Sequence, residues 1–481
     1  LDDDDSYSIR NDFFVELDDT SSLRFFGQFA NIDTNGSAMK GLDDTTAGAR
    51  NLRQDTLSKL TLTSSVLAGI YEKDLGFANL KVLASSQSDS ILVERDNDRH
   101  VYGTPAPSIP GISLDTGSSS YTRAEFLPET SEVDTDTLEI NLVSNEPILD
   151  GKLDYAFGIF YMNHEIENHI REYLDKNENN FPFDPKNNIK YECGSVYALP
   201  APNCFDTATG DPYIADFGFV TDAFPTRESK SIYGQTTYSI SDSLRFISGF
   251  RYTEDIFESL VSNFFGADEP PLLTGDTNEV TGRATFEYDL DSDTMIYFSQ
   301  TRGFKPGGSN LTFGRTKEGD AARNAFMVSI GQGFLSAALV DPMVLPTFES
   351  ETVDATEIGF KTDFLDGRAR ANVAIFDYSY DNLQVQATDP DVYRGGVVNL
   401  PESEVQGLEI EFTASLTDFL ILDANLGFLD TEVTKSYLYL DNVKAQQYSF
   451  GGEVEREALR EDVIGNDLPK SPKFTADISL I

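Results

Sequence analysis

The sequence predicts an all-β protein, an antiparallel meander of about fifteen strands. Three observations support this class: a composition rich in aromatic residues and glycine, alternation of apolar and polar residues, and a regular succession of short and long connections. Phe (35), Tyr (21) and Gly (35) are abundant and Trp is absent, and aromatic residues favour strands. Hydrophobic residues make up 40% of the 481 residues, which is enough for an ordered chain.

Alternation with a period of two divides each expected strand into a large apolar face and a polar or small face. The clearest examples are LDYAFGIFY, LRFISGFRY and LEIEFTASL. We expect one face of the sheet to carry Tyr155, Phe157, Ile159, Phe246 and Phe250. The opposite face then carries Arg245, Arg251, Glu409 and Glu411.

Many of the expected strands are longer than those of ordinary globular proteins. They run over 7–17, 22–32, 55–72, 76–93, 132–146, 151–166, 227–240, 243–258, 279–290, 293–303, 351–364, 368–387, 403–416, 419–434 and 472–481.

The connections between these strands alternate strictly between short and long. The short ones, such as ISDS, DLDSDT and LDG, are built from turn-forming residues. All tight turns must therefore lie at one end of the sheet and all long loops at the other. This asymmetry is typical of bacterial outer-membrane barrels, in which polar side chains point into the lumen and apolar side chains face lipid.

Charge and hydropathy exclude other classes. The net charge is −45, and nucleic-acid binding requires a basic surface. No apolar run reaches the length of a transmembrane helix. We interpret the acidity as an adaptation to salty surroundings, although a role in ligand binding stays open.

Several hairpins resemble those of the TonB-dependent outer-membrane receptors. The matching segments include DTMIYFSQTRGFKPGGSN, ETVDATEIGFKTDFLDGRARANVAIFDYSYDNLQVQ and SEVQGLEIEFTASLTDFLILDANLGFLDTEV. The resemblance extends from about Tyr7 to Ile481, and the long loops match least. It implies a 22-stranded barrel with a plugged lumen in the bacterial outer membrane.

The resemblance also implies parts that the sequence does not contain. We expect residues 1–481 to be a single partial barrel domain, with about three strands missing before it and four after it, out of 22. A plug domain and the segment that binds the TonB complex would precede it. The implied partners are the TonB complex, outer-membrane lipid and a small nutrient ligand, for a receptor that works as a monomer.

The segment TRGFKPGGSN begins as strand and continues as a Gly-rich connection. It does not have the G-x-x-x-x-G-K-[ST] order of a phosphate-binding loop. We expect it at the extracellular rim, where glycines allow a bend and Pro306 ends the strand pairing. The motif, with possible substrate contact, comprises Arg302, Gly303, Lys305, Pro306, Gly307, Gly308 and Asn310.

Cys193 and Cys204 lie in the longest expected connection, from about Glu167 to Arg227. Neither is part of a C-x-x-C motif, so a loop disulfide in an oxidising compartment is the better interpretation. We expect the disulfide to order this extracellular loop over the barrel mouth.

Enzyme chemistry finds little support in the sequence, and we expect no catalytic residues, cofactor or metal. His164 and His169 are five residues apart on one expected strand and so face opposite sides. Acidic runs such as LDDDD do not have the spacing of a calcium loop.

Two functions remain. The first is TonB-coupled import of a scarce nutrient, such as a ferric siderophore, a cobalamin or a saccharide. The second is a non-transporting surface protein, such as a passive porin or an adhesin.

Overall fold

The structure is a computed structural model. It describes residues 4–35, 58–96, 126–173, 191–193, 204–206, 212–213, 217–263, 272–310, 346–389, 394–440 and 460–481.

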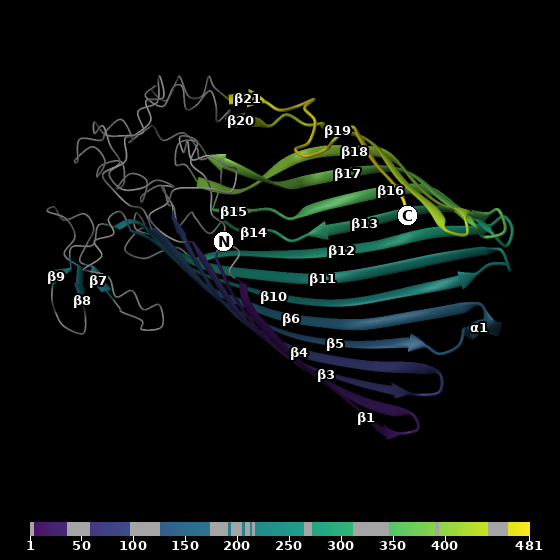
Figure 1. Ribbon diagram of the computed structural model, residues 1–481, viewed down its shortest axis with the longest axis horizontal. Coiled ribbons are helices and arrows are strands. Elements are labelled where there is room, and N and C mark those ends of the chain that lie inside the picture. Colours follow the sequence, from purple (N-terminus) through teal and green to yellow (C-terminus); the bar gives the residue numbers. More distant parts are fainter. Residues whose placement is uncertain are drawn as a thin grey trace.

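One antiparallel sheet of 15 strands dominates the described chain and curls into a trough (Figure 1). Each strand pairs with its neighbours along the chain, as expected for a meander. The strands are β1 (Asp4–Asp18), β2 (Ser21–Thr34), β3 (Lys59–Asp74), β4 (Ala78–Asp96), β5 (Phe126–Ser144), β6 (Leu153–Tyr173), β10 (Phe217–Ser239), β11 (Leu244–Asn263), β12 (Leu272–Asp289), β13 (Thr294–Lys305), β16 (Glu351–Phe364), β17 (Ala369–Asp389), β18 (Arg394–Thr417), β19 (Leu420–Val433) and β22 (Phe474–Leu480). The fold class and the fifteen strands predicted from the sequence are confirmed.

Strand boundaries agree best at the tight turns. At the other end many strands continue beyond the predicted limits: β10 begins at Phe217 rather than at residue 227, and β18 begins at Arg394 rather than at residue 403. In these two extensions, FGFVTDAFPT and RGGVVNLPE, apolar residues occur on both faces, so the alternation of period two disappears while the backbone pairing continues. The connection that holds the cysteines therefore runs from residue 174 to 216, which is shorter than expected.

The tight turns gather at one end of the sheet (Figure 1). Two of them contain the sequence LDG, and in both all three residues have positive φ, including Leu149 (54°), Asp150 (58°), Leu365 (55°) and Asp366 (57°). Turns with successive positive φ match the twist of the flanking strands, and Asp and Gly tolerate this conformation. The helix α1 (Ile148–Gly151) is one of these two turns.

The register separates an exposed apolar face from a more buried polar one. A row of directly opposed residues, Ile159, Ile232, Tyr252 and Val280, crosses four strands, and these side chains are 42–61% exposed. On the other face of β11, Thr253 and Asp255 are each 4% exposed. The exposed side chains here are the apolar ones, which is the reverse of a water-soluble protein.

Short strands form three small additional sheets. They are β7 (Tyr191–Cys193), β8 (Cys204–Asp206) and β9 (Pro212–Tyr213); β14 (Gly308–Ser309) and β15 (Thr347–Phe348); and β20 (Leu438–Leu440) and β21 (Arg460–Asp462). All three lie on the side of the long loops (Figure 1). No helix in the described part of the chain is long and apolar enough to span a membrane.

Candidate functional site on the polar face

The four residues predicted for the polar face share one face of the sheet. Arg245 and Glu409 belong to a single row of opposed residues that crosses six strands, through Glu287, Tyr297, Gly359 and Ala374. Arg251 and Glu411 lie an even number of residues further along the same strands and therefore face the same way. The predicted separation from Phe157, Ile159 and Phe250 is confirmed by the register.

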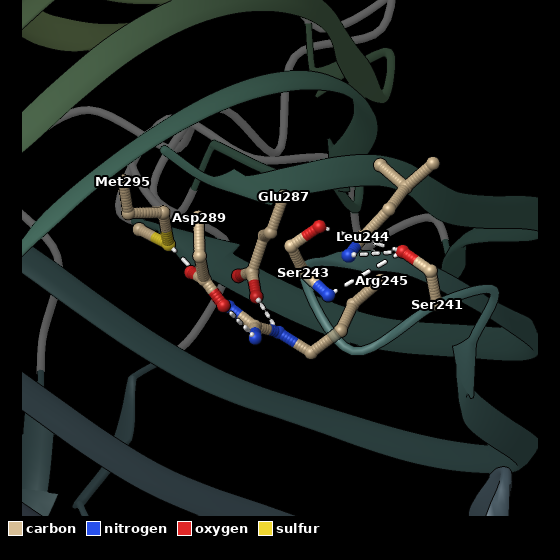
Figure 2. A network of polar contacts seen from close by, with 7 residues as sticks. All are labelled: Ser241, Ser243, Leu244, Arg245, Glu287, Asp289 and Met295. Carbon is tan, nitrogen blue, oxygen red and sulfur yellow. Dashed lines mark hydrogen bonds and ion pairs between the residues drawn. The ribbon is translucent and has the colours of Figure 1, made fainter. Parts of the chain in front are cut away.

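Arg245 binds two carboxylates near the tight turns (Figure 2). Its Nε donates to Glu287 at 3.0 Å, and its two terminal nitrogens donate to the two oxygens of Asp289 at 2.6 and 3.0 Å. A bidentate Arg–carboxylate pair is strong and directional. The network therefore cross-links β11 and β12 at the base of the polar face.

A polar cavity of about 520 Å³ adjoins this network, and Asp291, Lys361 and Arg370 help to line it. Arg370 is paired with Asp363 at 2.7 Å, and Lys361 lies 5.5 Å from the centre of the Tyr297 ring. Most charges at this end are thus partnered within the wall, which points to a structural role for the cavity lining.

Tyrosines on the polar face lie across glycines of neighbouring strands and reach carboxylates. Tyr233 is opposite Gly158 and donates to Glu139 at 2.5 Å. Tyr297 is opposite Gly359 and donates to Glu357 at 2.5 Å. A Cβ atom on either glycine would lie within 2.4 Å of the tyrosine ring, so only glycine leaves space for it.

The Gly-rich segment after β13 folds back against the polar face. Arg227 donates to the carbonyl oxygen of Gly307 at 2.6 Å, and Gln384 donates to that of Pro306 at 2.9 Å. The Asn310 side chain donates to the carbonyl oxygen of Val397 at 2.9 Å and accepts from its amide at 2.7 Å. The segment thus bridges β10, β17 and β18, and we call Pro306–Asn310 the strap.

The glycines of the strap are needed for close packing rather than for an unusual backbone angle. The described glycines with positive φ do not include Gly303, Gly307 or Gly308. A Cβ atom on Gly307 would lie 2.5 Å from the carbonyl oxygen of Phe348, and one on Gly308 would lie 2.7 Å from the Phe348 ring. The chain leaves the main sheet here, because β13 ends at Lys305, directly before Pro306, and β14 belongs to a separate sheet. The part that the glycines play in this bend stays a prediction.

The two cations of the rim motif point to different sides. Arg302 is on the apolar side of the sheet, directly opposite Gly282, and its guanidinium forms an ion pair with Asp354 at 2.9 Å. Lys305 is on the polar side, where it is exposed and opposite Glu351. Of the two, only Lys305 is placed to meet a ligand on the polar face.

The histidines also lie on opposite faces, as predicted. His164 contacts Thr135 at 2.8 Å, whereas His169 lies between Asp222 at 2.5 Å and Glu167 at 2.9 Å. Both ring nitrogens of His169 are thereby engaged.

The backbones of Cys193 and Cys204 face each other directly in the β7–β8 pair. Residues directly opposed in an antiparallel pair have Cα atoms about 4.5–5.5 Å apart, which lies within the range that a disulfide spans. The predicted bond stays a prediction.

Sequence reasoning missed several residues of this site. Arg227 and Asp255 form an ion pair of 2.6 Å on the polar face, and Gln384 holds the strap. Arg227 and Asp255 each lie an even number of residues away from polar-face residues of their own strand. The alternation along the strand could therefore have identified their face. Their contacts depend on the register between strands and could not be read from one strand alone.

The family model described as "TonB dependent receptor-like, beta-barrel" matches residues 2–480. Among curated relatives, the probable TonB-dependent siderophore receptor PiuA of Acinetobacter baumannii is 27% identical over 272 residues, which are 56% of this chain and 31% of PiuA. A ferric-pyoverdine 358 receptor of Pseudomonas putida is 22% identical over 182 residues, 37% of this chain and 18% of the receptor.

Solved structures of low sequence identity share the fold. The ferric yersiniabactin uptake receptor FyuA of Yersinia pestis superposes with a TM-score of 0.63 at 12% identity, over 99% of this chain and 56% of FyuA. The crystal structure of the A. baumannii siderophore receptor PiuA gives a TM-score of 0.62 at 18% identity, over 99% of this chain and 62% of PiuA.

The chain thus spans less than two thirds of the length of these relatives. The family match over nearly all residues agrees with the fifteen-stranded meander and its two chemically distinct faces. The chain belongs to the TonB-dependent receptor family, as the wall of an outer-membrane β-barrel.

Proposed function

We propose that this chain forms the barrel wall of a receptor that binds a ferric siderophore and imports it with energy from the TonB complex. The observation that carries the proposal is the family match over residues 2–480. Two relatives, one named a probable siderophore receptor and the other a ferric-pyoverdine receptor, favour this ligand class over a cobalamin or a saccharide.

The division of the sheet into two faces fits this role. The exposed apolar side chains suit contact with membrane lipid, and the polar face suits a water-filled lumen through which a solute passes. Charged residues such as Arg245 and Glu409 would be costly in lipid but are solvated in a lumen. We therefore assign Arg245, Arg251, Glu409 and Glu411 to the lumen wall.

The strap supports a receptor more than an open pore. It lies against the polar face at the end of the long loops, anchored at Arg227, Gln384 and Val397. Backbone tied across the wall in this way narrows the passage, and Lys305 beside it offers a positive charge for ligand contact. A passive porin or adhesin is the weaker alternative, and enzyme activity is not a property of a receptor family.

The remaining expectations follow from the family. We propose that residues 1–481 are one partial barrel domain, that a plug and a TonB-binding segment complete the receptor, and that the receptor works as a monomer.

Uptake by the complete receptor tests the proposal. The gene would be expressed in a bacterium without its own siderophore receptors, and entry of ⁵⁵Fe-labelled siderophores would be measured with TonB present or deleted. We expect accumulation of at least one ferric siderophore only when TonB is present. Entry of the label without TonB would indicate a passive pore, and no entry for any member of a broad siderophore panel would refute siderophore import.

A further inference from the structure

We infer that Arg251 and Arg283 form an anion-binding site on the polar face, suited to a carboxylate group. Arg283 is opposite Gly249, and Gly249 is two residues before Arg251 on β11. The two arginines are therefore diagonal neighbours on the same face of β11 and β12. They belong to neither the Arg245 network nor the strap.

Arg251 is held in position before any ligand arrives. Its guanidinium lies 5.1 Å from the centre of the Tyr233 ring and 5.5 Å from that of Phe160, and its Nε donates to Thr253 at 3.3 Å. Cation–π contacts occupy the faces of the guanidinium plane, whereas hydrogen bonds to an anion use its edge. Within the described part of the chain, no acceptor engages the terminal nitrogens of Arg251, which leaves them available to an anion.

Arg283 supplies the second cation. The position of a Cβ atom on Gly249 is 3.5 Å from Cγ of Arg283, so the arginine stem lies over this glycine, on the face that it shares with Arg251. The Arg283 side chain is exposed. An exposed guanidinium beside a fixed one can close on a bound anion with little change elsewhere in the wall.

Neither arginine has a carboxylate within 4.0 Å in the part of the chain that the structure describes. Four other arginines of the same face bind carboxylates: Arg24, Arg227, Arg245 and Arg370. In a chain with 81 acidic and 36 basic residues, two neighbouring arginines without a carboxylate are a marked exception. Glu139, the acid next to Tyr233, accepts from that tyrosine instead.

Electrostatics explains why an anion belongs here. Long side chains at diagonal cross-strand positions are within reach of each other, and two cations placed there repel. An anion between the two guanidinium groups replaces this repulsion with two charge-assisted hydrogen-bonded pairs, and the planar fork of arginine matches a carboxylate. The carboxylate can belong to a solute or to an acidic side chain of a receptor segment inside the lumen.

This inference rests on the proposed function only in placing the polar face in the lumen. Its test measures site occupancy rather than transport, so failure of siderophore import and failure of the anion site can be told apart.

Arginine-selective labelling of the complete purified receptor tests the site. Modification of Arg283 by p-hydroxyphenylglyoxal would be followed by mass spectrometry with and without citrate as the carboxylate probe. Arg368, an exposed arginine in the β16–β17 turn, is the internal control. For a solute site we expect citrate to slow labelling of Arg283 at least tenfold without affecting Arg368, and Arg251→Ala to weaken this protection about tenfold.

A second measurement identifies an internal carboxylate. If Arg283 is already protected without citrate, the variant Arg283→Lys would be treated with a carbodiimide, which joins a lysine directly to a carboxylate in contact with it. A cross-link from position 283 to an Asp or Glu of the receptor would assign the site to that segment. If citrate gives no protection and no cross-link forms, the anion site is refuted.

Discussion

Gly359 leaves no space for a side chain, because its Cβ atom would lie 2.1 Å from Cε1 of Tyr297. Overpacking of this kind costs about 1–3 kcal/mol. We therefore expect Gly359→Ala to lower the stability of the complete receptor, measured as a lower midpoint of thermal unfolding of the β-sheet by circular dichroism.

Gly303 is the matched control, because a Cβ atom there would be 3.4 Å from Cγ1 of Val353 on the strand opposite. Gly303→Ala should unfold close to the wild-type temperature. Equal midpoints for both variants would show that the Tyr297 ring moves aside without cost.

Asp462, the last residue of β21, accepts three hydrogen bonds. Ser436 donates at 2.7 Å, and the amides of Ile464 and Tyr437 each donate at 3.1 Å. The Ser436 hydroxyl, followed by the two amides, holds the pKa of Asp462 below its usual range.

Because the pKa of Asp462 is lower in the folded state than in the unfolded chain, the ionised carboxylate stabilises the contacts with Ser436, Tyr437 and Ile464 at pH values above the unfolded pKa. That stabilisation is lost as the pH falls through the lower, folded value. We expect amide hydrogen exchange at Tyr437 and Ile464 to be severalfold faster in Asp462→Ala than in wild type at pH 7. After correction for intrinsic rates, the exchange rates of the two proteins should become equal in strong acid. A difference in exchange rate that stays the same at all pH values would contradict the role of ionisation.

At the scale of elements, the β7–β8 pair is the structural basis for a disulfide. The residues Cys193 and Cys204 are directly opposed, and a disulfide between them would close a ring of about a dozen residues. The chain-entropy model gives such a bond roughly 3 kcal/mol of stabilisation. We expect peptides from a non-reducing digest of receptor purified from the cell envelope to be linked through these two cysteines in mass spectra. Free alkylation of both thiols would contradict the bond.

At the scale of the whole molecule, the two faces should respond differently to the same charge. Ile375 is 60% exposed on the apolar face, between Ile358 and Leu408. An arginine facing lipid costs about 2–4 kcal/mol near the membrane midplane. We expect Ile375→Arg to reduce barrel assembly, measured as the fraction of receptor that is folded in isolated outer membranes.

Asn425 provides the control on the polar face, where it is exposed and opposite Glu411 and Asp477. Asn425→Arg would place a cation beside two carboxylates and should assemble normally. Loss of assembly in Asn425→Arg but not in Ile375→Arg would reverse the assignment of lipid and lumen.

The sequence by itself determined the number of strands, their order in the meander, the end at which the turns lie and the face of residues within the alternating segments. These properties are local: an alternation of period two assigns a side chain to a face, and turn residues set where a strand reverses. The shared face of Arg245 and Glu409 could therefore be predicted although the two lie on different strands.

Only the tertiary structure decided which residues meet across strands. The lateral register brings Arg283 beside Arg251, Tyr297 across Gly359 and Arg227 to the carbonyl oxygen of Gly307. Register depends on the hydrogen bonds between strands and on the fit of side chains within each row. A single strand carries no record of its neighbour's position, so the strap and the arginine pair become visible only when the sheet is assembled.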